Sequence, residues 1–196
     1  TQGDGTVSVT ARITDIAGNV SAASPAQSVT VDTTAPGAPA ITAIAENDAG
    51  GISAGEASGG TPVVVGLAGT GGVAGNLLTL SWGSQTVVVT LAGSDISAGR
   101  VTVTVPISTI TAQGDGTFGV TAEVTDAAGN TGASAPALSV TVDTVAPGAP
   151  TVQSIVENDL GGIDAGEAMN GSPVVIGLAG TGALAGDTLT VLWGQQ

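Results

Sequence analysis

Carboxylate and amide oxygens are the groups in this sequence with an evident chemistry. The chain holds 16 Asp and Glu residues against two Lys and Arg, and it contains no His, Cys or Tyr. The usual general bases, thiol nucleophiles and nitrogen or sulfur metal ligands are therefore missing. Oxygen donors suit hard cations, and Ca²⁺ is the cation that we expect.

The same composition excludes several classes of function. A formal net charge of -14 excludes binding to nucleic acid or to an anionic membrane surface, because both need clustered Lys and Arg. No run approaches the roughly 18 apolar residues that a membrane-spanning helix requires, so we expect no membrane insertion in this segment. No carboxylate pair falls in a predicted cleft, so we expect no enzyme.

The chain repeats itself with an offset of 111 residues and no gap. About 55 of the 85 overlapping positions are identical. This period is too long for a solenoid unit and fits a whole small domain. The pairs that define the offset are Gln2–Thr6 with Gln113–Thr117, Val31–Thr33 with Val142–Thr144, Ala35–Pro39 with Ala146–Pro150, Glu46–Asp48 with Glu157–Asp159, and Trp82 with Trp193.

Prolines mark the boundary between copies. The segment Asp-Thr-x-Ala-Pro-Gly-Ala-Pro carries two prolines three residues apart, which prevents a central strand and stiffens an extended linker. The sequence therefore predicts the C-terminal part of one repeat at 1–32, a complete repeat at 33–143, and the N-terminal part of the next repeat at 144–196.

Apolar and polar residues alternate within the complete repeat, as in half-buried strands. The expected strands cover about 38–44, 62–68, 78–82, 85–92, 101–105, 118–124 and 138–142. Trp82 lies on the third, where immunoglobulin-like sandwiches often keep a core Trp. No segment has a sustained helical period. The predicted fold is all-β: tandem immunoglobulin-like antiparallel β-sandwich repeats.

Acidic residues fall in the loops at the two ends of this predicted sandwich. The 46–56 loop, Asp115 and Asp143 belong to the end where the chain leaves, and the 125–130 hairpin to the end where it enters. Stacked repeats would bring these groups together, and a cation would relieve their repulsion. Each of these acidic residues also suits a plain turn without a metal. The turn role is favoured most for Asp4 and Asp115, which lie between glycines. The candidate metal ligands are Asp32, Asp143, Glu46, Asp48, Glu56, Asp15, Asp126, Asn130, Asp115, Glu157, Asp159 and Glu167.

Three motifs together resemble bacterial Ig-like (BIg) repeats. They are the Val-Thr-Val-Asp-Thr-x-Ala-Pro junction, the Val-Thr-Asp-Ala-Ala-Gly-Asn hairpin at 124–130, and the Glu-Asn-Asp…Ala-Gly-Glu loop. Such repeats occur in giant type-I-secreted (RTX) adhesins and in biofilm-associated proteins. The resemblance implies extender domains with calcium at their junctions, held by Asp32, Asp143, the acids of the 46–56 loop, and Asp15 or Asp126.

The expected function is that of a structural spacer. We expect a secreted segment on the bacterial cell surface, stiffened by calcium between repeats, that projects an adhesive domain in cell adhesion or biofilm formation. Its partners would be neighbouring repeats of the same chain and calcium ions. The alternative is a repeat that itself binds a glycan, a surface or a partner adhesin, although the sequence has no aromatic platform or basic cluster for it.

Overall fold

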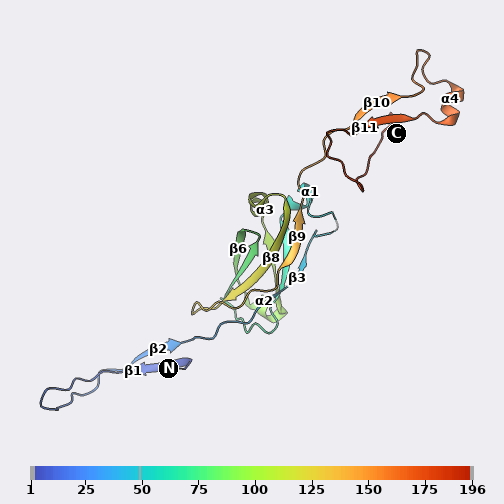
Figure 1. The fold of residues 1–196 in the computed structure, drawn as a ribbon. Helices are drawn as coiled ribbons and strands as arrows, with labels where there is room; N and C mark the ends of the chain where they lie inside the picture. Colours follow the sequence, from blue (N-terminus) through green and yellow to red (C-terminus); the bar gives the residue numbers. More distant parts are fainter. Residues whose placement is uncertain (1–2, 49, 195–196) are drawn as a thin grey trace. The chain divides into compact units, whose positions relative to one another are not determined.

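The computed structural model describes residues 3–48 and 50–194 (Figure 1). The chain forms two compact units, Thr1–Thr144 and Val145–Gln196, and each is described by itself. None of the helices within the described ranges is long and apolar enough to cross a membrane.

A two-layer sandwich forms the centre of the first unit (Figure 1). One sheet has the order β3-β4-β7, the other has the order β6-β5-β8-β9, and every pairing is antiparallel. All seven strands lie where the alternating sequence predicts them, and the all-β sandwich is confirmed. Their bounds are β3 Ala40–Ile44, β4 Thr61–Gly66, β5 Leu77–Trp82, β6 Gln85–Thr90, β7 Arg100–Val105, β8 Gly116–Thr125 and β9 Leu138–Val142.

The core lies between these two sheets. In β7 the buried positions alternate strictly with exposed threonines, which is the pattern of a strand with one face on a core. Trp82 on β5 is fully buried, and its indole N–H has no hydrogen-bond partner within the described residues. The rest of the cluster is aliphatic and comes from both sheets.

Three short helices join the strands, although the sequence shows no helical period. They are α1 Ala54–Ala57, α2 Gly93–Ala98 and α3 Ile107–Gln113. Ser53 and Glu56 form a capping box around α1, which satisfies backbone N–H groups at its start. Gln113 at the end of α3 accepts hydrogen bonds from the backbone and hydroxyl of Ser84.

The segments that the sequence predicts to be partial copies each contain one strand pair within the described residues. In the first unit, β1 (Gly5–Val9) pairs with β2 (Gln27–Val31) just as β8 pairs with β9. In the second unit, β10 (Thr151–Ile155) pairs with β11 (Val174–Gly177), with α4 (Ala165–Asn170) between them. This pair repeats β3 and β4, including the register irregularity after the second residue pair.

Candidate functional site: the junction between repeats

The carboxylate of Asp4 binds the beginning of the linker that follows β2. It accepts hydrogen bonds from the Thr33 N–H (2.9 Å), the Thr33 hydroxyl (2.6 Å) and the Thr34 hydroxyl (2.5 Å). The pairing of Gly5 with Val31 brings the two segments side by side. Donation by the Thr33 hydroxyl first, and then by the Thr34 hydroxyl and the Thr33 N–H, lowers the pKa of Asp4 below the ordinary aspartate value.

The same arrangement recurs 111 residues later. Asp115 accepts hydrogen bonds from the Thr144 N–H (3.1 Å) and from the Thr144 hydroxyl (2.7 Å). Here Gly116 pairs with Val142, as Gly5 pairs with Val31 in the preceding copy. In both copies, the aspartate just before the first strand of a pair binds the threonine that follows the second strand: Asp4 binds Thr33, and Asp115 binds Thr144.

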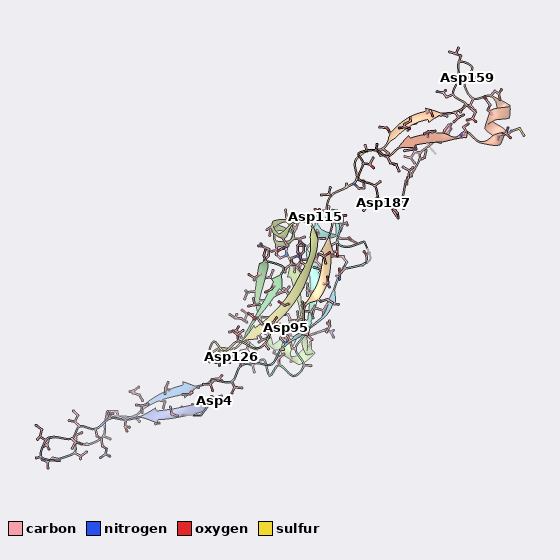
Figure 2. All side chains as sticks on the ribbon, in the orientation of Figure 1. Asp4, Asp95, Asp115, Asp126, Asp159 and Asp187 are labelled. Carbon is pink, nitrogen blue, oxygen red and sulfur yellow. The ribbon has the colours of Figure 1, made fainter. Side chains whose placement is uncertain are left out.

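At the other end of the sandwich, Asp126 organises the hairpin between β8 and β9 (Figure 2). Its carboxylate accepts bonds from the backbone N–H groups of Ala128 and Asn130 and from the Asn130 side chain, all at 2.9 Å. The Asn130 side chain lowers the pKa of Asp126. The same amide nitrogen also donates to the main-chain oxygen of Asp32 at 3.0 Å, which ties the hairpin to the linker.

Asp15 and Asn19 repeat this hairpin in the first copy. The backbone and side-chain nitrogens of Asn19 both donate to the Asp15 carboxylate at 2.8 Å, and the side-chain bond is the main cause of a lowered pKa for Asp15. Both hairpin aspartates therefore already have turn partners, which is the plain-turn role that the sequence allowed.

The loop at 46–52 lies against the end of β9. The Asn47 side-chain nitrogen donates to the Ser139 oxygen at 2.9 Å, and the Thr141 N–H donates to the Asn47 side-chain oxygen at 3.4 Å. Ile52 exchanges backbone bonds of 2.9 and 3.0 Å with Thr141 and Asp143. The loop, Asp115 and Asp143 thus lie at the same end of the sandwich, as the sequence predicts.

Within this loop one carboxylate oxygen stands apart from the others. Asp48 accepts from the Gly50 N–H, and Glu56 accepts from the backbone and hydroxyl of Ser53. The Oε2 atom of Glu46 is buried and has no hydrogen-bond partner within the described part of the chain. Glu46 also has a left-handed backbone with φ 63°, which is uncommon for a residue other than glycine.

The carboxylates of the equivalent loop in the third copy have the same pattern of hydrogen-bond partners. The Oε2 atom of Glu157 is buried without a hydrogen-bond partner among the described residues. Asp159 accepts from the Gly161 N–H, and Glu167 accepts from the Asp164 N–H, both at 2.8 Å. The unpaired glutamate oxygen is therefore a property of this loop in two copies.

These donors fit calcium by their chemistry, although no three acids are assembled. Within residues 3–48 and 50–194, no group of three or more His, Cys, Asp or Glu side chains is placed to hold a metal ion. A buried carboxylate oxygen without a partner is unfavourable in a folded protein and is relieved by a cation. Calcium ligation by the candidate residues remains a prediction.

Several residues of the junction do not stand out in the sequence. Thr33, Thr34 and Thr144 bind the aspartates, and Asn47 attaches the loop to β9. Thr33, Thr144 and Asn47 repeat at an offset of 111 within the junction and loop motifs, but this repetition is shared with many residues that have no such role. Thr34 has no such signal, because Val145 stands at its position in the next copy.

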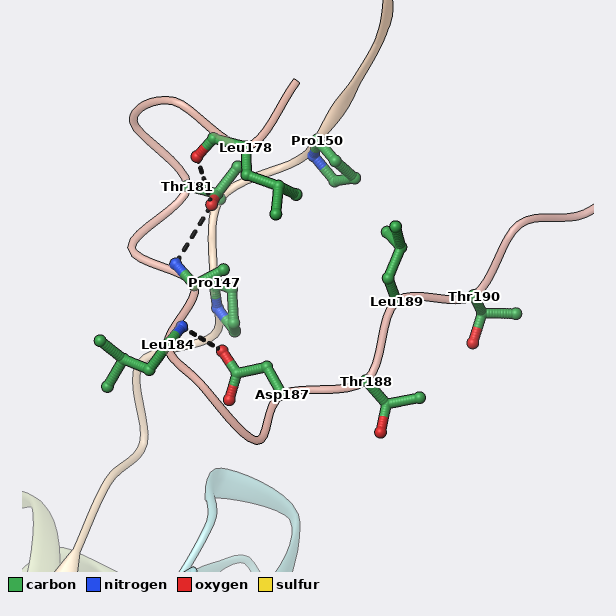
Figure 3. A pocket seen from close by; sticks show the side chains of 11 residues that line it. Pro147, Pro150, Leu178, Thr181, Leu184, Asp187, Thr188, Leu189 and Thr190 are labelled. Carbon is green, nitrogen blue, oxygen red and sulfur yellow. Dashed lines mark hydrogen bonds between the residues drawn. The ribbon is translucent and has the colours of Figure 1, made fainter. Parts of the chain in front are cut away.

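A groove in the second unit corresponds to core in the complete repeat (Figure 3). Its lining includes Leu178 and Leu189, which are 48% and 49% exposed. Their equivalents 111 residues earlier, Leu67 and Leu78, are buried in the core of the complete repeat. The groove is therefore an apolar face that the remaining strands of a repeat cover, not a separate ligand pocket.

Comparison with known proteins finds one family model that matches part of the chain. Residues 74–144 match the family model of the bacterial Ig-like domain, a span that runs from before β5 to the end of the complete repeat. Among curated proteins, no sequence matches the chain.

Three solved structures are similar to parts of the chain. One is a Ca²⁺-stabilised adhesin that helps an Antarctic bacterium to reach out and bind ice, with 32% identity over 83% of this chain and 37% of that chain, at a TM-score of 0.42. A second is a 1.5-MDa bacterial ice-binding adhesin studied for its retention at the host cell surface, with 32% identity, 71% and 42% coverage and a TM-score of 0.39. The third is a bacterial immunoglobulin-like domain from the M. primoryensis ice-binding adhesin, with 28% identity, 56% and 100% coverage and a TM-score of 0.35.

The chain spans less than half the length of the first two of these chains. The bacterial Ig-like domain that residues 74–144 match is a non-enzymatic domain. The resemblance that the junction, hairpin and loop motifs carry is thus confirmed: residues 74–144 of this chain match the bacterial Ig-like domain.

Proposed function

We propose that the chain is an extender segment of a larger bacterial surface adhesin, a spacer whose repeats hold an adhesive domain away from the cell. One observation carries the proposal: Asp4 binds Thr33, and Asp115 binds Thr144, with the same contacts 111 residues apart. Repeats that join through the same contacts add length in equal steps, which suits a spacer. The partners are then the neighbouring repeats of the same chain.

Calcium at the junctions is the second part of the proposal. Glu46 would supply one oxygen to the ion. Asp48, Glu56 and Asp143 at the same end of the sandwich are the other candidate ligands, and they would have to move closer together to share it, because the described residues hold no assembled group of three acids. The unpaired buried oxygen of Glu46, and that of Glu157 in the next copy, support this assignment. Bound calcium would neutralise carboxylates in a chain of net charge -14.

A second set of candidate ligands surrounds the linker. Asp32 begins it, and Asp126 and Asn130 lie in the hairpin that contacts it. Asp15 and Asn19 are their equivalents in the first copy. The turn bonds of these aspartates leave carboxylate lone pairs available, since each oxygen accepts more than one bond.

The proposed location of this segment is the outer surface of the bacterial cell. Secretion by a type I route and a place in adhesion or biofilm formation follow from the RTX adhesins that the motifs resemble. Ions bound only by the folded repeat would stabilise it by mass action where calcium is abundant. The binding of ice belongs to the similar proteins and forms no part of this proposal.

Small-angle X-ray scattering of the chain tests the proposal. We expect a larger maximum dimension in a few millimolar calcium than in EGTA, because stiff junctions resist bending. Magnesium at the same concentration is the control, since it prefers strict octahedral sites and keeps its waters. The same maximum dimension in calcium and in EGTA would contradict stiffening by calcium.

A further inference from the structure

The linker after β2 contacts the complete repeat through Gly37. Its N–H donates to the Thr70 oxygen at 2.7 Å, and a Cβ added to Gly37 would lie 2.8 Å from the Gly69 oxygen. Thr70 is buried, and its hydroxyl donates to the Leu67 oxygen and accepts from the Gly72 N–H. The linker backbone therefore lies directly on a fixed turn of the repeat.

The second unit shows the same contact independently. Gly148 donates to the Thr181 oxygen at 2.7 Å, and a Cβ on Gly148 would lie 3.2 Å from the Thr181 Cα. Thr181 is buried and is bonded to Leu178 in the same way as Thr70 is bonded to Leu67 (Figure 3). Each linker is thus attached to the repeat that follows it.

Gly132 provides a further contact in the complete repeat. It is held by a backbone bond to Val124, and a Cβ added to it would lie only 2.2 Å from the Pro36 oxygen. The backbone conformation of Gly132 is open to any residue, so the close linker is the reason why a side chain does not fit. The preceding copy carries Ser21 at the equivalent position.

Contacts from the preceding copy hold the other end of the same segment. Asp4 binds Thr33 and Thr34, and Asn130 of the complete repeat binds the oxygen of Asp32. We define residues 32–37 as the junction segment. Two copies of the repeat therefore contact a stretch of six residues through hydrogen bonds between protein groups.

We propose that the junction segment is ordered by the protein alone, through Asp4 on one side and Asn130, Gly132 and Thr70 on the other, before any cation binds. The inference rests on the proposed spacer function and deepens it. Calcium then adds stiffness to a junction whose path is already set. Asp4 and Gly132 are positioning residues: they determine the path of the linker and leave the core of the repeat unchanged.

Backbone ¹⁵N relaxation of the chain in EGTA tests this inference. We expect heteronuclear NOE values for Thr33, Thr34 and Gly37 that match those of the sandwich core. In Gly132→Ala, the added methyl group displaces Pro36, and we expect amide exchange at Gly37 to rise by about tenfold, the factor for losing one hydrogen bond's net stabilisation. Gly93→Ala is the matched control, because Gly93 has open space and an ordinary backbone.

The two aspartates serve as controls for each other. Asp4→Ala should lower the NOE values of Thr33 and Thr34 and leave Thr144 unchanged, whereas Asp115→Ala should do the reverse. Core amide shifts should stay constant in all four variants, which separates a local effect from general destabilisation.

Each outcome separates this inference from the calcium proposal. Low linker NOE values in EGTA that rise with calcium would overturn the inference and leave a calcium-stiffened spacer in place. Low values in both buffers would overturn both proposals. Core-like values that persist in both Gly132→Ala and Asp4→Ala would show that these contacts do not order the segment. Core-like values in EGTA that fall in these variants support the inference, whether or not calcium changes the scattering.

Discussion

The side-chain amide of Asn130 donates a 3.0 Å hydrogen bond to the main-chain oxygen of Asp32, which precedes it by 98 residues. This bond joins the last hairpin of the complete repeat to the end of the preceding copy. The same amide group also binds Asp126, so one side chain holds both the hairpin and the junction. A change at Asn130 should therefore alter both.

Replacement of Asn130 by Ala should raise the pKa of Asp126 toward the ordinary aspartate value. The Asn130 side chain is the largest cause of the lowered pKa, and its bond is lost in the variant. A carboxylate with a lowered folded-state pKa contributes stability that is present above the unfolded value and is lost as pH falls through the folded value. The hairpin contribution is thus complete at neutral pH, and it is lost progressively as the pH falls from about 4 through the lower folded-state pKa.

A carboxyl ¹³C titration of Asp126 by NMR measures this change. Asp15 is the internal control, since its partner Asn19 is untouched. An unchanged pKa for Asp126 in Asn130→Ala would mean that the bond between the two side chains is not formed in solution.

Substitution of the two tryptophans should cost very different amounts of unfolding free energy. Trp82 is fully buried, whereas its repeat equivalent Trp193 is 53% exposed. Trp82→Ala should cost about 3–5 kcal/mol of unfolding free energy, as for large core side chains, and Trp193→Ala much less. Denaturant unfolding gives both values, and acrylamide quenching should report one accessible tryptophan. Equal costs for the two variants would contradict the assignment of the core.

Glu46→Gln should have effects of opposite sign with and without calcium. The substitution keeps the shape of the side chain and removes a charge from a buried oxygen that lacks a partner. In EGTA the variant should be more stable than the unmodified chain, because a neutral amide costs less to bury without a partner than a charged carboxylate does. In calcium it should bind the ion more weakly, which isothermal titration calorimetry measures.

Glu123→Gln on β8 is the matched control for this variant, since it removes a charge far from the loop. Calcium binding by Glu46→Gln that equals that of the unmodified chain would remove Glu46 from the site. Lower stability in EGTA would show that its carboxylate has a partner in solution.

The strands could be predicted from the sequence because the alternation of apolar and polar residues that marks a strand lies within the strand itself. The alternation in 101–105 directly sets which side chains of β7 are buried, and Trp82 marks the core of β5. The helices could not be predicted from a 3.6-residue hydrophobic period, because segments of four to seven residues span only about one or two turns. The Ser53-x-x-Glu56 spacing was the available signal for α1.

The contacts of the candidate site are harder to predict. Asn47 and Ser139 are 92 residues apart, and no local pattern encodes their bond. The acids also have competing roles that only the structure separates. Asp48 and Glu56 complete a turn and a helix cap, whereas Glu46 keeps an oxygen without a partner.

Thermal unfolding of the chain in EGTA and in a few millimolar calcium tests the central claim most directly. Ions that bind only the folded repeats stabilise them by mass action, so we expect the unfolding temperature to rise by about 10 °C or more at a hundredfold excess over Kd. Superimposable curves in EGTA and calcium would contradict a spacer stiffened by calcium.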